Sequence, residues 1–228
     1  GIKCGIMDQF ISLMGRKDRA FFLDCRTLEY QHVPLDLGEH QILICHSGVK
    51  HALVDSEYNA RREECQIGLG IIQKHFSGIE ALRDAKLEEA EFCQEEMGPK
   101  IFRRCRHVIT ENERVLASVE ALRKGDLGRF GRLMNASHDS QRDDYEVSCP
   151  EVDLLVDLAR KTPGTLGARI TGGGFGGCTI NLVAGQALPD FTEGVLKEYQ
   201  RLTKIEPHLY ISAPAEGGKI IFPPNLGG

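Results

Sequence analysis

Residues 167–183 read G-A-R-I-T-G-G-G-F-G-G-C-T-I-N-L-V. Five of the six positions from Gly172 to Gly177 are glycine, and each costs conformational entropy on folding. The flanking segments 168–170 and 179–183 look like strands, so the run predicts a tight turn between them. Successive amide groups without side chains can also curl around an anion such as phosphate or a carboxylate. A turn and an anion site are compatible interpretations.

The same run contains G-x-G-x-x-G at Gly172, Gly174 and Gly177. A dinucleotide-binding fingerprint requires a helix directly after the glycines and an acidic residue about twenty positions further on. Residues 178–183 instead continue as a β-rich apolar run, and no suitably placed acidic residue follows. We therefore reject a Rossmann dinucleotide site.

Composition and charge exclude several classes of protein. The chain has 228 residues, 41% hydrophobic and 27% charged, and a net charge of −5. This acidic balance argues against a generic nucleic-acid binder. No apolar run approaches the roughly 20 residues that span a bilayer, and no signal-peptide pattern opens the chain. We expect neither nucleic acid nor a membrane as a partner.

The chain contains eight cysteines and no C-x-x-C pair. Their even spacing predicts buried free thiols in a reducing compartment, not a disulfide framework or a zinc site. We therefore expect a cytoplasmic protein.

The order of predicted elements indicates an α+β fold. Gly98-Pro99 should break one helix, Gly125 should end the next, and Pro150 should begin another. A hairpin followed by one helix and one more strand is typical of an α+β sandwich, not of a doubly wound sheet. We predict strands at 19–25, 28–33, 41–46, on both sides of the glycine run and at 208–212, and helices at 53–76, 86–97, 100–124, 126–140, from 150 and at 190–204.

Three further segments carry residues that could do chemistry. Asp8 lies among apolar residues, either as a functional carboxylate or as an N-cap or first-turn residue of a helix. Tyr58 could place its hydroxyl over a ligand or pack at the edge of a core. The segment 138–145 is either a catalytic set or a helix end and loop laced by ion pairs.

Together these segments resemble the galactokinases, a branch of the GHMP family of small-molecule kinases. The resemblance covers nearly the whole chain, and the joint occurrence of its motifs is specific. The segments that carry it are C-G-I-M-D-Q-F-I-S at 4–12, S-E-Y-N-A-R-R at 56–62, S-H-D-S-Q-R-D-D-Y-E-V-S-C-P-E at 137–151 and G-A-R-I-T-G-G-G-F-G-G-C-T at 167–179.

The resemblance implies a GHMP-kinase-like fold with a ferredoxin-like C-terminal α/β sandwich. Residues 1–50 would end the β-rich N-terminal domain, and residues 51–228 would form the C-terminal domain. The family's first motif and its Gly/Ser-rich phosphate loop are not found in the sequence. We therefore expect a C-terminal portion that is inactive without the N-terminal half. Strands 19–33 and 41–46 should then lack partners and expose aggregation-prone edges.

For the sugar, the resemblance implies ATP-dependent phosphorylation of the C1 hydroxyl of α-D-galactose. Asp8 would accept the proton of that hydroxyl. Gly5 would contact the sugar through its backbone, and Tyr58 would contact it through its side chain. The arginine that pairs with this aspartate in the family is missing here.

For the phosphates, the resemblance implies ATP and Mg²⁺, with the expected magnesium ligands outside these residues. Lys50, and more weakly Arg169, would be cations near the transferred phosphate. The glycines implied beside the sugar and that phosphate are Gly172, Gly173, Gly174 and Gly176.

Two related functions stay open. The first is a non-catalytic galactokinase-like protein that senses galactose and ATP and binds a transcriptional regulator. The second is a kinase of the same family that acts on N-acetylgalactosamine or arabinose. Turnover and sugar preference would separate these alternatives from a galactokinase.

Overall fold

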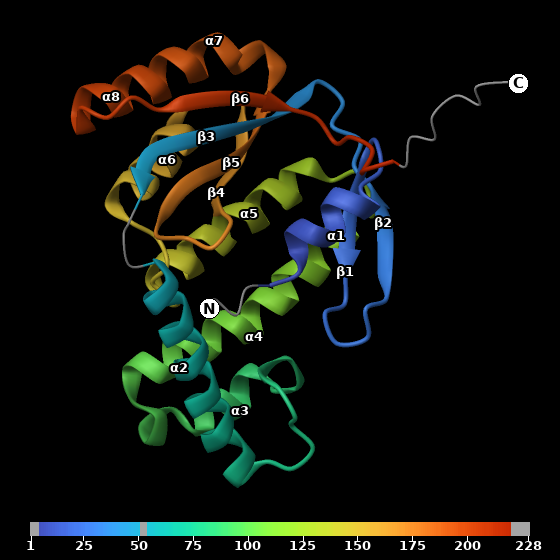
Figure 1. Ribbon diagram of the computed structural model, residues 1–228, viewed down its shortest axis with the longest axis vertical. Coiled ribbons are helices and arrows are strands. Elements are labelled where there is room, and N and C mark those ends of the chain that lie inside the picture. The colour runs from blue at the N-terminus through green and yellow to red at the C-terminus, as the bar shows by residue number, and fades with distance from the viewer. Residues whose placement is uncertain (1–4, 51–53, 220–228) are drawn as a thin grey trace, which may run out of the picture.

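The fold is built on a four-stranded antiparallel sheet with the strand order β4-β5-β3-β6 (Figure 1). A computed structural model describes residues 5–50 and 54–219. Along the chain the sheet reads strand, helices, two strands, helix and strand, which is the split β-α-β arrangement of ferredoxin-like folds. The predicted α+β class and ferredoxin-like core are confirmed. The sheet strands are β3 (His40–Lys50), β4 (Thr165–Thr171), β5 (Gly176–Ala184) and β6 (His208–Ser212).

The glycine run forms the turn of the β4–β5 hairpin, as predicted. Pairing between the two strands runs from Thr165 opposite Val183 to Thr171 opposite Cys178. The strands therefore end where the glycines begin. The turn lies at one end of the sheet, on the side of α2 (Val54–His75).

Strand β3 has partners along both of its edges. It pairs with β5 from His40 opposite Ala184 to Lys50 opposite Gly176, with an irregularity after His46. On its other side it pairs with β6 over 42–46. The expectation that 41–46 lacks partners is therefore wrong, because strands more than 130 residues away in sequence complete the sheet. A domain boundary after residue 50 stays a prediction, although the strand that precedes it is central to the sheet beyond it.

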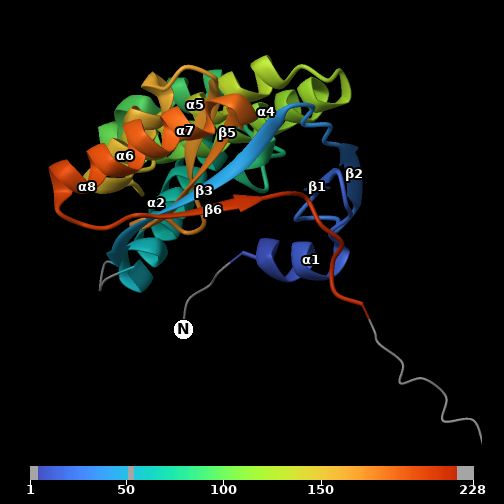
Figure 2. The same cartoon turned by 90° about the horizontal axis from the view of Figure 1, so that it is seen from above.

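One face of the sheet is covered by α6 (Pro150–Lys161) and by the helical segment from α7 (Leu188–Phe191) to α8 (Glu198–Thr203) (Figure 2). The predicted helix at 190–204 is this segment, and its middle turns, Thr192–Lys197, are π-helical. The core between the layers contains Leu43, Cys45, Leu155, Val156, Ala159, Ala168, Val183, Ala187, Phe191, Val195 and Tyr199. Burial of this apolar surface is the main force that holds the layers together.

Helix α5 (Leu127–Asp143) lies against β4 at backbone contact distance. Asp126 caps its start by accepting a hydrogen bond from the Arg129 amide at 2.8 Å, as the sequence predicted. A Cβ atom on Gly131 would lie 2.2 Å from the carbonyl oxygen of Leu166. The two elements can approach this closely only because position 131 has no side chain.

We expect Gly131→Ala to destabilise the protein by about 1–3 kcal/mol, because α5 must move away from β4. Gly128→Ala, one turn earlier in the helix, is the matched control. Its Cβ would be 3.6 Å from its nearest neighbours, and alanine there should stabilise the helix by roughly 0.5–1 kcal/mol. Urea unfolding of both variants checks the two signs, and equal midpoints would contradict the close-contact argument.

The helices α2, α3 (Leu87–Phe92) and α4 (Gln94–Arg123) form a second layer with its own core below the sheet (Figure 1). Gly98 has φ +68° and ψ +166°, so the helical path bends there, where Gly98-Pro99 predicted a break. The core of this part contains Leu69, Ile72, Ile79, Leu82, Ala85, Ala90, Cys93, Met97, Phe102, Cys105 and Ile109. None of the helices in 5–50 and 54–219 is long and apolar enough to span a membrane.

A separate hairpin of β1 (Arg19–Leu23) and β2 (Tyr30–Pro34) follows α1 (Met7–Met14) and confirms the predicted strand pair. Two ion pairs tie its turn to the short helix at 82–84: Arg26 to Asp84 at 2.7 Å and Arg83 to Asp24 at 2.6 Å. The guanidinium of Arg26 lowers the pKa of Asp84 to about 2. The hairpin is therefore fixed to the α2–α4 layer through its turn.

Candidate functional site

The β4–β5 turn presents open backbone to its surroundings. Gly172 and Gly173 are exposed, and a Cβ on either would meet no described atom within 4 Å. Gly172 has φ +82°, a left-handed conformation that glycine adopts without strain. Neither amide donates a hydrogen bond to any residue in 5–50 or 54–219. Both amides can therefore receive an oxygen anion.

Gly174 serves a different purpose from its two neighbours. A Cβ there would lie 2.4 Å from the carbonyl oxygen of Val147, and its φ is +88°. The next amide, that of Phe175, donates a 2.6 Å hydrogen bond to the same carbonyl. The close approach at Gly174 is thus to the chain itself. Gly176 is buried, opposite Lys50 in the sheet.

Helix α2 contacts the glycine turn through Arg61. The Arg61 guanidinium carbon lies 5.7 Å from the centre of the Phe175 ring. Tyr58, one turn earlier on the same helix, is half-buried. The structure therefore brings the helix that carries Tyr58 against the turn that carries the glycines.

Asp8 is exposed in the first turn of α1, and Ile6 occupies the N-cap position. Asp8 therefore occupies the predicted first-turn position, where the helix dipole favours a negative charge, and its functional role stays a prediction. Within the described chain, the Asp8 side chain forms no ion pair or hydrogen bond. Gly5 is also exposed, immediately before the helix. In both views α1 begins on the side of the molecule that faces α2 (Figures 1 and 2).

The two predicted cations lie in different surroundings. The backbone of Lys50 lies opposite Gly176, beside the turn, whereas its side chain is outside what the structure describes. Arg169 donates through Nε to the carbonyl of Ile170 at 3.0 Å, and Glu111 lies 3.9 Å from its Nη1. Arg169 also lines a cavity, and its suggested place near the phosphate stays a prediction.

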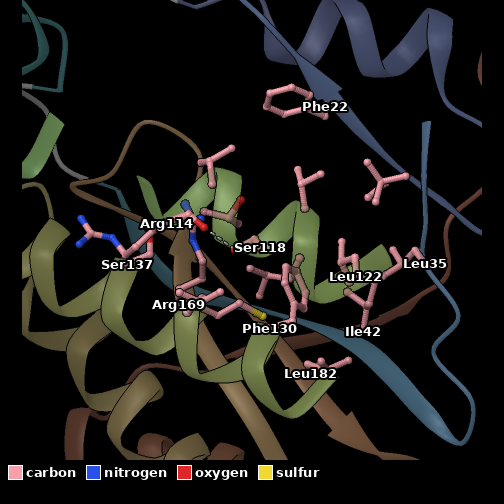
Figure 3. Close-up of a pocket in the computed structure, with 18 of the residues that line it drawn as sticks. Phe22, Leu35, Ile42, Arg114, Ser118, Leu122, Phe130, Ser137, Arg169 and Leu182 are labelled. Carbon is pink, nitrogen blue, oxygen red and sulfur yellow. Dashed lines mark hydrogen bonds between the residues drawn. The ribbon is translucent and has the colours of Figure 1, made fainter. Parts of the chain in front are cut away.

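That cavity has a volume of about 350 Å³ and lies between the β1–β2 hairpin, α4, α5 and the second face of the sheet (Figure 3). Its polar side chains, including Arg114, Ser137 and Arg169, gather at one side, and apolar ones line the rest. Apart from Arg169, the predicted site residues with described side chains do not line it. The cavity is therefore distinct from the turn where Gly172 and Gly173 are open.

The segment 138–145 is a helix end and loop with several ion pairs, among them Arg106–Asp144 and Arg160–Asp139. Arg104 is fully buried and donates to Glu64 at 2.7 Å, to Glu146 at 2.5 Å and to the Asp144 carbonyl at 2.5 Å. Burial by itself would lower the pKa of Arg104, but the hydrogen bonds to Glu146 and Glu64 outweigh it and raise that pKa. This network fixes the loop that contacts the glycine turn.

His107 belongs to the same region and makes stability depend on pH. It is buried, lies 2.9 Å from the Ser140 hydroxyl and stacks on Tyr145, and burial lowers its pKa from 6.5 to about 4. Between these values the unfolded chain binds the extra proton, so the free energy of unfolding should fall as the pH falls from 6.5 to 4.

We expect His107→Phe, which keeps a ring against Tyr145, to reduce that pH dependence. The slope of the unfolding free energy against pH should lose the contribution of one titrating proton. Urea unfolding of both proteins at several pH values from 7.5 to 4 measures the slope directly. Parallel slopes for the two proteins would show that His107 is not the group responsible.

Sequence reasoning missed Arg61 and Val147, the residues that hold the turn from behind. Arginines are mostly exposed, so the sequence predicts a surface position for an arginine early in a helix. A contact to a backbone carbonyl leaves no signal in the sequence. Within 5–50 and 54–219, no group of three or more His, Cys, Asp or Glu side chains could hold a metal ion. We therefore assign no magnesium ligand. The seven described cysteines are free as predicted, although Cys25 is exposed, not buried.

Comparison with known proteins agrees with this arrangement. The family description "GHMP kinases C terminal" matches residues 118–198. Galactokinase from Homo sapiens is 45% identical over 97% of this chain, and galactokinase from Roseiflexus sp. (strain RS-1) is 41% identical over 95%. The crystal structure of Lactococcus lactis galactokinase complexed with galactose superimposes with a TM-score of 0.90 and 37% identity over 95% of the chain.

The split β-α-β sheet, the glycine turn and these matches define the class of fold, which is similar to the C-terminal part of GHMP kinases. Three proteins to which the chain is similar at 37–45% identity, from Homo sapiens, Roseiflexus sp. (strain RS-1) and Lactococcus lactis, are galactokinases. The chain spans about half the length of the curated relatives it matches, 54% of the human protein and 55% of the Roseiflexus protein.

Proposed function

We propose that this chain is the C-terminal part of a galactokinase, which transfers the γ-phosphoryl group of ATP to the C1 hydroxyl of α-D-galactose. The observation that carries the proposal is the TM-score of 0.90 with a galactose-bound galactokinase, over 95% of the chain. Asp8, Tyr58 and the glycine turn are all present. Phosphoryl transfer depends mainly on positioning and on charge stabilisation, and this constellation suits both.

On the sugar side, Asp8 is the proposed general base. Its exposed carboxylate would accept the proton of the C1 hydroxyl while the sugar oxygen bonds to the γ-phosphorus and ADP departs. Gly5 would offer its backbone to galactose, and the half-buried Tyr58 would offer its side chain. An exposed carboxylate with no described ion-pair partner is free to take this role.

On the phosphate side, the open amides of Gly172 and Gly173 are proposed to face the transferred phosphoryl group. Amides that are already in place stabilise developing negative charge without reorganisation. Gly174 and Gly176 act by shaping the turn, and Lys50 is proposed as a nearby cation. ATP would enter with Mg²⁺, whose protein ligands are proposed to lie outside the described residues.

We further propose that the chain alone is inactive and needs the N-terminal half that its relatives possess. In that arrangement, residues 1–50 end the N-terminal domain and residues 51–228 form the C-terminal domain. The unpaired thiols of the described cysteines support a reducing, cytoplasmic compartment.

The test is the intact mass and activity of the native gene product. We expect a mass well above the 25.3 kDa of this chain, and ATP-dependent phosphorylation of galactose. Initial rates on galactose, N-acetylgalactosamine and arabinose should favour galactose. A product that binds galactose and ATP without turnover would identify a sensor, and a preference for another sugar would identify a related kinase. Activity of the isolated 228-residue chain would contradict the need for a second half.

A further inference from the structure

We propose that Arg61 is a positioning residue that fixes the glycine turn relative to the helix that carries Tyr58. This inference rests on the proposed function, because it concerns the geometry of the same site. Arg61 would not touch either substrate. It would act through the loop at 145–147 and through Phe175.

The first contact is between Arg61 and the loop. Its Nε donates to the Tyr145 carbonyl at 2.7 Å, and its Nη2 donates to the Glu146 carbonyl at 2.9 Å. Glu146 adopts a positive φ of +53°, which turns two successive carbonyls toward one guanidinium. A residue other than glycine pays a conformational cost there, so the surrounding contacts must hold it in place.

The second contact is between that loop and the glycine turn. The Val147 carbonyl accepts the Phe175 amide at 2.6 Å, and Gly174 packs against the same carbonyl. Phe175 itself has a positive φ of +60°. The turn is therefore seated on Val147, which directly follows the two carbonyls that Arg61 holds.

The third contact is between Arg61 and the glycine turn itself. The Arg61 guanidinium lies over the Phe175 ring at 5.7 Å, within the range of a cation–π interaction. Glu57 and Glu64 lie 3.3 and 3.7 Å from its Nη1, which steadies the planar group. One side chain of α2 thus contacts the turn both directly and through the loop.

Lysine cannot reproduce this arrangement, although it would keep the positive charge. An ammonium group lacks the planar fork that serves two carbonyls and stacks on a ring. A lysine at position 61 should therefore leave the turn attached to Val147 but free to shift relative to Tyr58. A small displacement of a group that stabilises the transition state lowers kcat strongly.

The experiment compares wild type with Arg61→Lys in the native gene product. We expect the Phe175 amide, which donates to the Val147 carbonyl, to exchange roughly tenfold faster, as for the loss of one charged hydrogen bond, with no change in α7–α8. We expect kcat for galactose to fall by about 10- to 100-fold, with little change in the KM for galactose. Arg201→Lys, at the exposed Glu198 pair on α8, is the matched control and should change neither quantity.

Phe175→Leu gives a second readout. Because Arg61 and Phe175 act together, we expect the effects of Arg61→Lys and Phe175→Leu on exchange to be less than additive in the double variant. A folded Arg61→Lys protein with wild-type exchange at the Phe175 amide would overturn the proposal, as would increased exchange with an unchanged kcat. A wild-type protein that does not phosphorylate galactose would instead refute the proposed function, while the exchange data would still decide whether Arg61 fixes the turn.

Discussion

Asp8→Asn should reduce galactose phosphorylation by the native gene product by about 10²- to 10⁴-fold. A sugar hydroxyl is a weak nucleophile at neutral pH, so the reaction gains from a carboxylate that accepts its proton during transfer. Asparagine has the same shape and retains an oxygen that can accept a hydrogen bond, but it cannot take up the proton. Initial rates at saturating galactose and ATP measure the loss, and calorimetric titration with galactose should show that binding is largely retained.

Asp190→Asn is the matched control for this experiment. Asp190 is an exposed acidic residue in the first turn of α7, just as Asp8 is in the first turn of α1. Both substitutions remove the same favourable interaction with a helix dipole. Only Asp8→Asn should affect the rate. A variant at position 8 that retains the wild-type rate would assign the base to another residue and return Asp8 to a purely helical role.

The sequence was sufficient for the elements whose signals are local. The glycine run predicted the β4–β5 turn, Asp126 predicted the start of α5, and Pro150 predicted the start of α6. In each case a backbone requirement, such as a positive φ or an unpaired amide, selects a particular residue type nearby. The boundaries of these elements could therefore be placed from the sequence within a few residues.

The position of β3 could not be predicted in the same way. Its partners, β5 and β6, follow it by well over a hundred residues, and no feature of the sequence 41–46 indicates which strands pair with it. An apolar strand that pairs on both sides looks the same as one that awaits a missing neighbour. The residue types of the candidate site could be predicted from motifs, but the contacts that hold the site could not. These contacts run from buried arginines to backbone carbonyls, which carry no side-chain signature.

Arg104→Met should destabilise the protein by roughly 3 kcal/mol, the lower end of the range for breaking a buried ion pair. Methionine fills a similar volume, so the loss reports the guanidinium and not a cavity. The substitution leaves Glu64 and the Asp144 carbonyl without their buried donor. The cost stays at the lower end because Lys100 also pairs with Glu64, and because Glu146 is partly exposed and retains Arg103.

The Arg104 effect should extend beyond stability, because the loop it holds also seats the glycine turn through Val147. Urea unfolding measures the free energy, and hydrogen exchange at 144–149 should increase before the α6 to α8 layer opens. Arg123→Met, at the exposed end of the same helix, removes an i,i+3 pair with Glu120 and should cost less than about 1 kcal/mol. Similar losses for the two variants would mean that the buried network contributes no more than a surface pair. The loop would then have to be held by Arg61 and by packing alone.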